Sequence, residues 1–578
     1  MIWYFEDYRR YRREREVLEA LASSAHWLIP IGWRVDGELH MIWDADILVP
    51  VGVRPISLRY PNHFPHSPPM VLPRGVKERW SGHQYGAGGE LCLEYGPDNW
   101  HPDLTGADMI SSAHRLFSGE QPSPGLAAEV ASRHLTTLGQ YLRAERSRFL
   151  VTRTQTKFFA GIAEHILLTA KAYLFFHDHS FINIISSVSL SDGETWRDTL
   201  PGPFTLECER DITLGRWPSK VPWPSMKSLE DFRADASLQG FDLPDVKDVL
   251  FVRGSRIRAF FLNNDNNHVS ETPVIPPEPD APRLDDGHKA LPGRKVAVIG
   301  CGSLGSKIAV MLSRAGVGGF FLVDDDLLMP DNFVRHDLDW RDVGTHKADS
   351  VASRIQLVNP AATCKVRKHR LGGQESSGSV ESLIEALSEC DLIIDATAEP
   401  SVFNYLCAAV AVGKKPLLWA EVFGGGFGGL IARHRPGLEP SPQSMRSIVE
   451  NWCADRGHQV ARPAKRYDGG PELPAIADDA DVSVIAAHAA RMAIDLLIPR
   501  DPSSFPNSVY LIGLSKAWLF SQPFETYPID VGQPEPPTLP GDEDPQLAVE
   551  EAERIIKLFV KYKNATSPSE PADPAPAE

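Results

Sequence analysis

The sequence predicts a mixed α/β protein built from two different α/β parts. Residues 27–60 alternate apolar and polar side chains, as expected for a meander of antiparallel strands. From residue 294 onward, short apolar strands alternate with helical segments, which is typical of a doubly wound sheet. Residues 266–293 are polar and proline-rich, which indicates a linker. We therefore expect an N-terminal α+β domain and a C-terminal doubly wound α/β domain.

Composition narrows the class of partner. The chain has 578 residues, 42% of them hydrophobic and 23% charged, as in globular proteins of several domains. Its net charge of -17 makes nucleic acid a poor partner, because acidic surfaces repel a phosphate backbone. No apolar run approaches the roughly 20 residues that span a bilayer, and the first residues lack the apolar core of a secretory signal. We expect a cytoplasmic protein that binds neither nucleic acid nor membrane.

The N-terminal part is expected to begin and end with helices. Residues 7–22 carry apolar positions at helical spacing and predict a helix before the meander. Residues 61–73 are too rich in proline for regular structure. A loop around Cys92 follows, and residues 104–118 and 126–149 predict two further helices.

Fewer signals follow this part. Residues 158–176 are an apolar run that predicts a helix, and no motif is evident between residues 151 and 265. The last residues have the composition of a disordered tail. The expected domains are 1–150 around Cys92, a connector at 151–265, a linker at 266–293, the doubly wound domain at 294–545, and a C-terminal helix with a tail at 546–578.

A glycine-rich turn begins the C-terminal domain. The strand Lys295–Ile299 runs into a turn of sequence GCGSLG and then into a helix. Glycines let the backbone approach a phosphate, and the helix N-terminus supplies aligned N–H groups. About twenty residues later Asp324 ends a second strand, where it can bind ribose hydroxyls. This order predicts a nucleotide site formed by Gly300, Gly302, Ser303, Gly305 and Asp324.

The residues after Asp324 distinguish this site from that of a dehydrogenase. They include, in order, Asp326, Asn332, Arg335, Gly344 and Lys347. With this set, residues 290–435 resemble the ubiquitin-activating superfamily, which includes the ThiF-type bacterial enzymes that adenylate sulfur-carrier proteins. The resemblance implies a Rossmann-like adenylation domain that binds ATP through these residues.

The chemistry of adenylation explains the residue types. A carboxylate that attacks the α-phosphorus of ATP brings two anions together, so cations must offset the repulsion and stabilise the departing pyrophosphate. Arg335 can bind phosphate oxygens with a fork of donors, and Lys347 can act as a point charge. Asn332 can orient the phosphates.

An acidic turn further along suggests a metal site. In the family, the corresponding strand end carries two aspartates, one of them linked to magnesium. Asp395 keeps the first aspartate, Ala398 takes the place of the second, and Glu399 follows. The resemblance implies that Asp395 or Glu399 holds Mg²⁺, or that the metal site is altered.

The N-terminal part has a signature of its own. Over residues 25–120 it resembles the ubiquitin-conjugating fold, with matches at Tyr60, Pro61, Pro68, Pro69, His83, Gly89, Cys92, Leu93, Trp100 and Pro102. A cysteine in a polar, glycine-rich loop suits thioester chemistry, because a thiolate is a good nucleophile. The resemblance implies that Cys92 carries the thioester. The family's His-Pro-Asn is His83, Gln84 and Tyr85 here, so His83 and a backbone N–H remain candidates for oxyanion support.

Cys453 is the candidate for an earlier thioester. Activating enzymes use a cysteine of their own before transfer, and Cys453 is the cysteine found between about residues 435 and 480. Arg456 and His458 could lower its pKa. The spacing of its apolar neighbours equally fits a packed helix face. The alternative route passes directly from the adenylate to Cys92.

A conjugating-like part followed by an activating-like part resembles the single-chain ligases of bacterial anti-phage systems of the CBASS type. The resemblance implies that the C-terminal tail of a partner is adenylated with ATP and Mg²⁺, carried on Cys92, and joined to a lysine of a target protein. The partner is either a cGAS-type cyclic-oligonucleotide synthase or a small ubiquitin-like protein. The resemblance also implies a homodimer.

Three alternatives stay open. A sulfur-carrier adenylating enzyme would leave the Cys92 motif unexplained. A nicotinamide oxidoreductase would use the glycine turn but not Asn332, Arg335 and Lys347 in that order. An inactive binding scaffold would fit the altered His-Pro-Asn segment, the missing second aspartate and the displaced second cysteine.

Overall fold

The computed structural model describes residues 2–566 apart from residues 51, 121–137, 144, 178, 201–207, 244, 246, 278–283, 370, 372–376, 460–475, 499 and 535–544. The chain divides into two compact units, Met1–Glu145 and Arg146–Glu578. Each unit has hydrophobic cores of its own.

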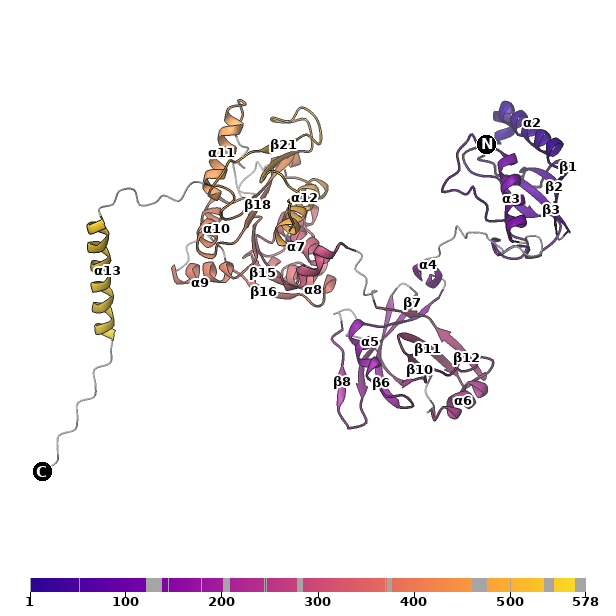
Figure 1. The fold of residues 1–578 in the computed structure, drawn as a ribbon, viewed down its shortest axis with the longest axis horizontal. Coiled ribbons are helices and arrows are strands. Elements are labelled where there is room, and N and C mark those ends of the chain that lie inside the picture. Colours follow the sequence, from indigo (N-terminus) through magenta and orange to yellow (C-terminus); the bar gives the residue numbers. More distant parts are fainter. Residues whose placement is uncertain are drawn as a thin grey trace. The chain divides into compact units, whose positions relative to one another are not determined.

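The first unit is an antiparallel meander with helices before and after it (Figure 1). Helix α2 begins after Asp7, whose side chain accepts a hydrogen bond from the Arg10 N–H. Helix α3 buries Met109, Ile110, Ala113 and Phe117, which recur at helical spacing, in the core of this unit. The elements are α1 (Trp3–Glu6), α2 (Tyr8–Ser24), β1 (Leu28–Val35), β2 (Met41–Val49), β3 (Gly52–Tyr60), β4 (Met70–Pro73), α3 (Gly106–Glu120) and α4 (Leu138–Leu142).

The first helix, the meander and the helix after the Cys92 loop are confirmed, but two sequence expectations in this unit are wrong. Strand β4 lies inside the proline-rich stretch 61–73, because its four residues pair with the exposed edge of β3. The helix expected at 126–149 does not extend to its end, because residues 147–150 form a strand. Residues 126–137 of that helix lie outside the described residues.

The second unit begins with a nine-stranded mixed sheet in the order β12-β11-β10-β9-β6-β7-β5-β13, with β8 paired to β7. Its cores lie around Phe149, Leu214 and Leu250, and around Trp217 and Phe251. The elements are β5 (Ser147–Leu150), α5 (Arg153–Ala160), β6 (Leu167–His177), β7 (Ser180–Ser189), β8 (Thr195–Arg197), β9 (Glu209–Arg216), α6 (Leu229–Leu238), β10 (Asp248–Arg253), β11 (Arg256–Asn263), β12 (His268–Thr272) and β13 (Val274–Ile275).

This sheet overturns two expectations. The apolar run 158–176 is helical only to Ala160; its second half is β6, in which Leu168, Ala170 and Ala172 alternate into the core. The linker expected at 266–293 is wrong over residues 268–275, where β12 pairs with β11 and β13 pairs with β5. Local composition missed both cases because partners distant in sequence determine the pairing.

The C-terminal part of the second unit contains an eight-stranded sheet in the order β16-β15-β14-β17-β18-β19-β20-β21. The strands from β16 to β18 are parallel, and those from β18 to β21 are antiparallel. The elements are η2 (Asp286–Gly293), β14 (Lys295–Ile299), α7 (Ser303–Ala315), β15 (Gly319–Val323), η3 (Pro330–Val334), η4 (Trp340–Asp342), α8 (Lys347–Val358), β16 (Thr363–Arg367), α9 (Ser377–Ser388), β17 (Leu392–Asp395), α10 (Pro400–Gly413), β18 (Leu417–Val422), η5 (Gly424–Gly426), β19 (Gly428–His434), α11 (Pro442–Ala454), α12 (Asp479–Leu497), β20 (Val509–Gly513) and β21 (Thr526–Ile529).

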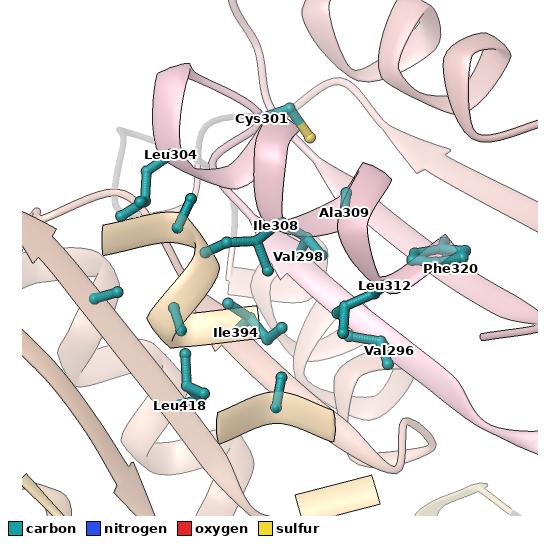
Figure 2. Packing of buried hydrophobic residues seen from close by; sticks show 14 of the residues in the cluster. Val296, Val298, Cys301, Leu304, Ile308, Ala309, Leu312, Phe320, Ile394 and Leu418 are labelled. Carbon is teal, nitrogen blue, oxygen red and sulfur yellow. The ribbon is translucent and has the colours of Figure 1, made fainter. Parts of the chain in front are cut away.

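Both faces of this sheet are buried, as in a doubly wound fold. Along β14, Val296 and Val298 point into a core with α7, α8 and α12, whereas Ala297 and Ile299 point into a core with α9, α10 and α11. Leu304, Ile308 and Leu312 form the buried stripe of α7 against this sheet (Figure 2). Helix α7 ends at Gly316, which has a left-handed φ of 106°.

A last helix, α13 (Pro545–Thr566), confirms the C-terminal helix, and the tail after it lies outside the described residues. Among the described residues, no helix combines the length and hydropathy needed to cross a bilayer.

Candidate active site

Three parallel strands bring the candidate nucleotide residues to one edge of the sheet. Ile299, at the end of β14, pairs with Val323 of β15 on one side and with Asp395 of β17 on the other. Gly300 and Asp324 directly follow these strands, so they and Asp395 lie side by side at the carboxyl edge. From β14 the chain continues to β15 and β16 on one side of the strand and then returns to β17 on the other side. Such a reversal of strand order leaves a crevice for a ligand at the carboxyl edge.

The glycines of the turn have different roles. Gly300 has a φ of +84°, and a Cβ there would lie 2.9 Å from Thr397 Cγ2. A Cβ on Gly305 would lie 1.8 Å from the Gly300 carbonyl oxygen, so this glycine lets α7 approach the turn. A Cβ on Gly302 would have no atom within 4 Å, so this glycine borders open space and is not required by packing within the protein.

Asp324 holds the turn in place. Its Oδ2 accepts a hydrogen bond from the Cys301 N–H at 2.7 Å, and its Oδ1 accepts one from the Asp326 N–H at 2.9 Å. Burial raises the pKa of Asp324, against the opposing effects of the Asp326 N–H and of the Lys347 charge. The ribose contact expected for Asp324 remains a prediction.

The ordered set after Asp324 gathers near the same edge. Lys347 Nζ lies 2.9 Å from Asp326 Oδ2, and the lysine side chain is only 12% exposed. The short helix η3 carries Asn332 and ends at Arg335. Asn332 Oδ1 accepts a hydrogen bond from the Met329 N–H, which fixes the start of that helix. The structure thus pairs Asp326 with Lys347, and the Arg335 N–H donates to the Asn332 carbonyl oxygen at 3.1 Å.

Sequence reasoning missed His336. Its ring is buried, and Nε2 lies 2.8 Å from the Cys301 carbonyl oxygen in the glycine turn. Burial, together with the nearby charges of Lys347, Lys307 and Arg335, lowers the pKa of His336 to about 4, although the hydrogen bond with Cys301 opposes the shift. A neutral ring donates from Nε2 to Cys301 and accepts the Leu338 N–H at Nδ1. The sequence feature that could have identified His336 is its position next to Arg335.

Lys307 was also missed because its neighbours in the helix are apolar. Its side chain is 7% exposed, and Nζ lies 2.6 Å from Asp479 Oδ1 at the start of α12. The pair connects the helix after the glycine turn to a helix that follows it by 172 residues.

Asp395 lines a small pocket beside the turn. It is 3% exposed, and its Oδ1 accepts hydrogen bonds from both the N–H and the hydroxyl of Thr397. Burial raises its pKa to about 6, and these hydrogen bonds together with the charge of Arg446 oppose that shift. The pocket is lined by Asp395, Ala398, Glu399, Phe403, Trp419, Ala420, Glu421 and Arg446.

The acids around this pocket suit a hard cation. Among the described residues no group of three His, Cys, Asp or Glu side chains could hold a metal on its own. Mg²⁺ often binds one or two carboxylates and completes its shell with water and phosphate oxygens, so Asp395 with Glu399 fits a metal that enters together with a nucleotide.

In the first unit, Cys92 lies in a tight hairpin. The Cys92 N–H donates to the His83 carbonyl oxygen at 2.7 Å, and the Tyr85 N–H donates to the Glu90 carbonyl oxygen at 3.0 Å. Cys92 is half-buried. Burial raises the pKa of its thiol, a hydrogen bond with Tyr85 lowers it, and the charge of Glu90 raises it. His83 Nε2 lies 4.0 Å from Glu120 Oε1.

Cys453 lies on a packed helix face, one of the two alternatives that the sequence allowed. It is fully buried in α11, in the same core as Met445 and Val449. Burial raises the pKa of its thiol to about 11, despite the charge of Arg456. A neutral, buried thiol is a poor nucleophile. The geometry therefore fits a structural cysteine.

A family model and several known sequences resemble parts of the chain. The ThiF family model matches residues 282–465. An uncharacterized Sinorhizobium fredii protein, y4qC, is 30% identical over 226 residues, which are 37% of this chain and 38% of that protein. The Pseudomonas aeruginosa "ATP-dependent ubiquitin transferase-like protein Cap2" is 35% identical over 123 residues, 21% of each chain. The Escherichia coli "Sulfur carrier protein ThiS adenylyltransferase" is 31% identical over 147 residues, 25% of this chain and 55% of that one.

Each match therefore spans only part of the relative. Among solved structures, E. coli MccB with ATP aligns over 43% of this chain and 67% of that chain, at 17% identity and a TM-score of 0.32, which is too low to support a conclusion. The family match coincides with the glycine turn and the residues from Asp324 to Lys347. The C-terminal half of the chain thus carries a ThiF-family domain of adenylyltransferase type, and relatives of the chain include proteins named ATP-dependent ubiquitin transferase-like Cap2.

Proposed function

We propose that this chain adenylates the C-terminal carboxylate of a partner protein and transfers the resulting acyl group through Cys92 to a target amine. One observation carries the proposal: the chain that bears the ThiF-family site also bears a half-buried cysteine in a hairpin between a four-stranded meander and a helix. An adenylating enzyme for a free carrier protein has no need of that second site.

The first step is an attack of the partner's carboxylate on the α-phosphorus of ATP, which releases pyrophosphate. Gly302 leaves space for the phosphates, and Arg335 and Lys347 offset their charge. Mg²⁺ bound at Asp395 would neutralise charge on the phosphate oxygens. The Cys92 thiolate then attacks the acyl carbon and releases AMP, and a lysine amine of the target displaces the thiol.

Cys92 is the only thiol we assign to this route. Cys453 is buried, with a pKa raised to about 11, so an intermediate on it would require α11 to open. We therefore favour direct transfer from the adenylate to Cys92 over the route through Cys453. The relatives named ATP-dependent ubiquitin transferase-like protein Cap2 support the transfer chemistry. As partner we propose a cyclic-oligonucleotide synthase or a ubiquitin-like protein in a CBASS-like setting, with the chain acting as a homodimer, on the resemblance of its sequence to the single-chain ligases.

The test is a non-reducing gel of the purified chain with ATP, Mg²⁺ and each small protein encoded beside it. We expect a thiol-sensitive adduct that disappears with Cys92→Ala and persists with Cys453→Ala. Partner-dependent exchange between ATP and pyrophosphate should remain in Cys92→Ala. Loss of exchange in that variant would contradict the division of labour between the two sites.

A second candidate is adenylation of a sulfur-carrier protein, which the likeness to the E. coli ThiS adenylyltransferase favours. In that case the adenylated tail would be converted to a thiocarboxylate by a sulfur donor, with no adduct on Cys92. Mass spectrometry of the partner's C-terminus distinguishes the two outcomes.

A further inference from the structure

In the hairpin that carries Cys92, successive side chains point alternately to an inward and an outward face. Gln84 and Leu91 form an antiparallel bridge, flanked by hydrogen bonds from Cys92 to His83 and from Tyr85 to Glu90. Gln84 and Leu91 are 5% and 6% exposed, so this face points inward. Neighbouring residues in a strand point to opposite faces, so the side chains next to them share the outer face. These are His83, Tyr85, Glu90 and Cys92.

Tyr85 stands diagonally across from Cys92 on that outer face. Diagonal neighbours in an antiparallel pair lie about 7–8 Å apart, within reach of a long aromatic side chain. The tyrosine side chain is hydrogen-bonded to Cys92, and its ring is otherwise largely in solvent, with 57% of the residue exposed. The hydroxyl therefore touches the reacting sulfur from the side open to a substrate.

Gln84 cannot supply the same donor from its position. Its amide oxygen accepts the Trp80 N–H at 2.8 Å. Its amide nitrogen donates to the carbonyl oxygens of Glu78 and Gly89. All three bonds hold the loop together on the inward face, away from Cys92.

We propose that the Tyr85 hydroxyl is the oxyanion donor of the Cys92 site. This inference rests on the function proposed above, since it needs an acyl group on Cys92. When an amine attacks the acyl carbon, a C–N bond forms and the carbonyl oxygen gains negative charge, which the Tyr85 O–H stabilises by donating to it. The C–S bond then breaks, the electron pair returns to the Cys92 sulfur, and the proton lost by the amine ends on the thiolate or in solvent.

The Tyr85 hydroxyl also acts on the Cys92 thiol before the thiol is acylated. Before loading, it donates to the Cys92 sulfur and lowers the pKa of that thiol against the effects of burial and of Glu90. One donor thus favours the thiolate in the empty site and the oxyanion in the loaded site.

The test loads Cys92 without ATP or a partner. The full-length chain is incubated with a glycylglycine thioester of mercaptoethanesulfonate, which acylates thiols by exchange, and Cys92→Ala identifies the fraction bound elsewhere. Free lysine is then added, and discharge of the Cys92 acyl group is followed by mass spectrometry. We expect Tyr85→Phe to slow this discharge by about 100-fold, the low end of the loss of one oxyanion donor.

Tyr8→Phe is the matched control, because Tyr8 is a largely exposed tyrosine in the same unit, on α2. It should discharge at the wild-type rate. The pH dependence of Cys92 alkylation supplies a second readout, in which Tyr85→Phe should shift the thiol titration to higher pH.

Discharge of Tyr85→Phe within twofold of wild type would overturn the proposal, whatever happens to the thiol titration. Because the loading needs no nucleotide, the outcome is separate from the function proposed above. Slow discharge in Tyr85→Phe combined with no ATP-dependent adduct for any partner would support the oxyanion donor and reject the adenylation route.

Discussion

Among single residues, His336 has a charge state that the fold controls strongly. Its pKa is about 4 in the folded chain and near 6.5 when exposed, so between these values the unfolded chain binds more protons. The contribution of neutral His336 to the free energy of unfolding is therefore fully present above pH 6.5 and decreases as the pH falls toward 4. The loss should reach about 3 kcal/mol, at 1.36 kcal/mol for each pH unit.

The variant His336→Gln isolates this effect, because a glutamine amide can still donate to the Cys301 carbonyl oxygen but does not titrate. Urea unfolding of wild type and variant between pH 4 and 7 should give a stability difference that shifts in favour of the variant as the pH falls. A difference that is constant across this range would show that His336 is not buried in its neutral form.

Asp395 has the opposite dependence in the same range. Its pKa is raised to about 6 from an ordinary value of 3.8, so between these values the folded chain binds more protons and loses stability as the pH rises. Asp395→Asn should therefore stabilise the chain at pH 8 by about 1–3 kcal/mol, because a buried carboxylate is removed. The same variant should lose exchange between ATP and pyrophosphate. Unfolding and exchange assays on one preparation check both results, and a destabilised variant would contradict the origin of the pKa shift.

Sequence alone could predict the residues whose types and order reflect chemistry. The glycine turn and Asp324 directly follow two parallel strands and Asp395 ends a third, so their approach at one edge follows from the fold class. It could not predict His336 and Lys307, because their roles depend on burial against residues distant in the sequence. It also left Cys453 undecided, since a packed face and a reactive cysteine have the same spacing.

At the scale of elements, the turn between β14 and α7 contains one glycine that packing requires, Gly305, and one that we expect to matter only for ligand binding, Gly302. Gly305→Ala would place a Cβ 1.8 Å from the Gly300 carbonyl oxygen, so α7 must move away from the turn. We expect a loss of about 1–3 kcal/mol in unfolding free energy, as for other overpacked sites, together with loss of ATP binding.

Gly302→Ala is the paired variant, because its Cβ would meet no protein atom within 4 Å. Its unfolding free energy should stay within about 0.5 kcal/mol of wild type, and only its affinity for ATP should fall. Denaturant titration and calorimetric titration with ATP measure the two quantities. Equal destabilisation by both variants would contradict this separation of roles.

The elements that sequence missed share one cause. Strands β4, β6, β12 and β13 lie in segments whose composition favours loops or a helix. Each becomes a strand because a partner strand is available, and pairing energy outweighs local preference. Helices α2 and α7 were predictable because their signals are local: the Asp7 cap lies directly before α2, and the apolar stripe of α7 lies within the helix itself.

For the whole molecule, the division into two units predicts separate unfolding. The first unit has its own core, in which Ile110 of α3 is fully buried. Ile110→Ala should cost about 2–5 kcal/mol in that unit alone. Scanning calorimetry of the intact chain should show one transition moved to lower temperature while the transition of the ThiF-family domain stays in place. A common shift of all transitions would mean that the units unfold together.

The pairing of α7 with α12 also limits when the nucleotide site can form during synthesis. The matched ThiF range ends at residue 465, before α12, β20 and β21, although these elements complete the same sheet and core. A ribosome adding about 5–20 residues per second needs on the order of ten to thirty seconds to pass from Lys307 to its partner Asp479, 172 residues later. During that interval the strands β14 to β18 can already cover the apolar stripe of α7, but the side of α7 that contacts α12 stays exposed. A recombinant fragment cut at the family boundary would keep that side of α7 exposed permanently.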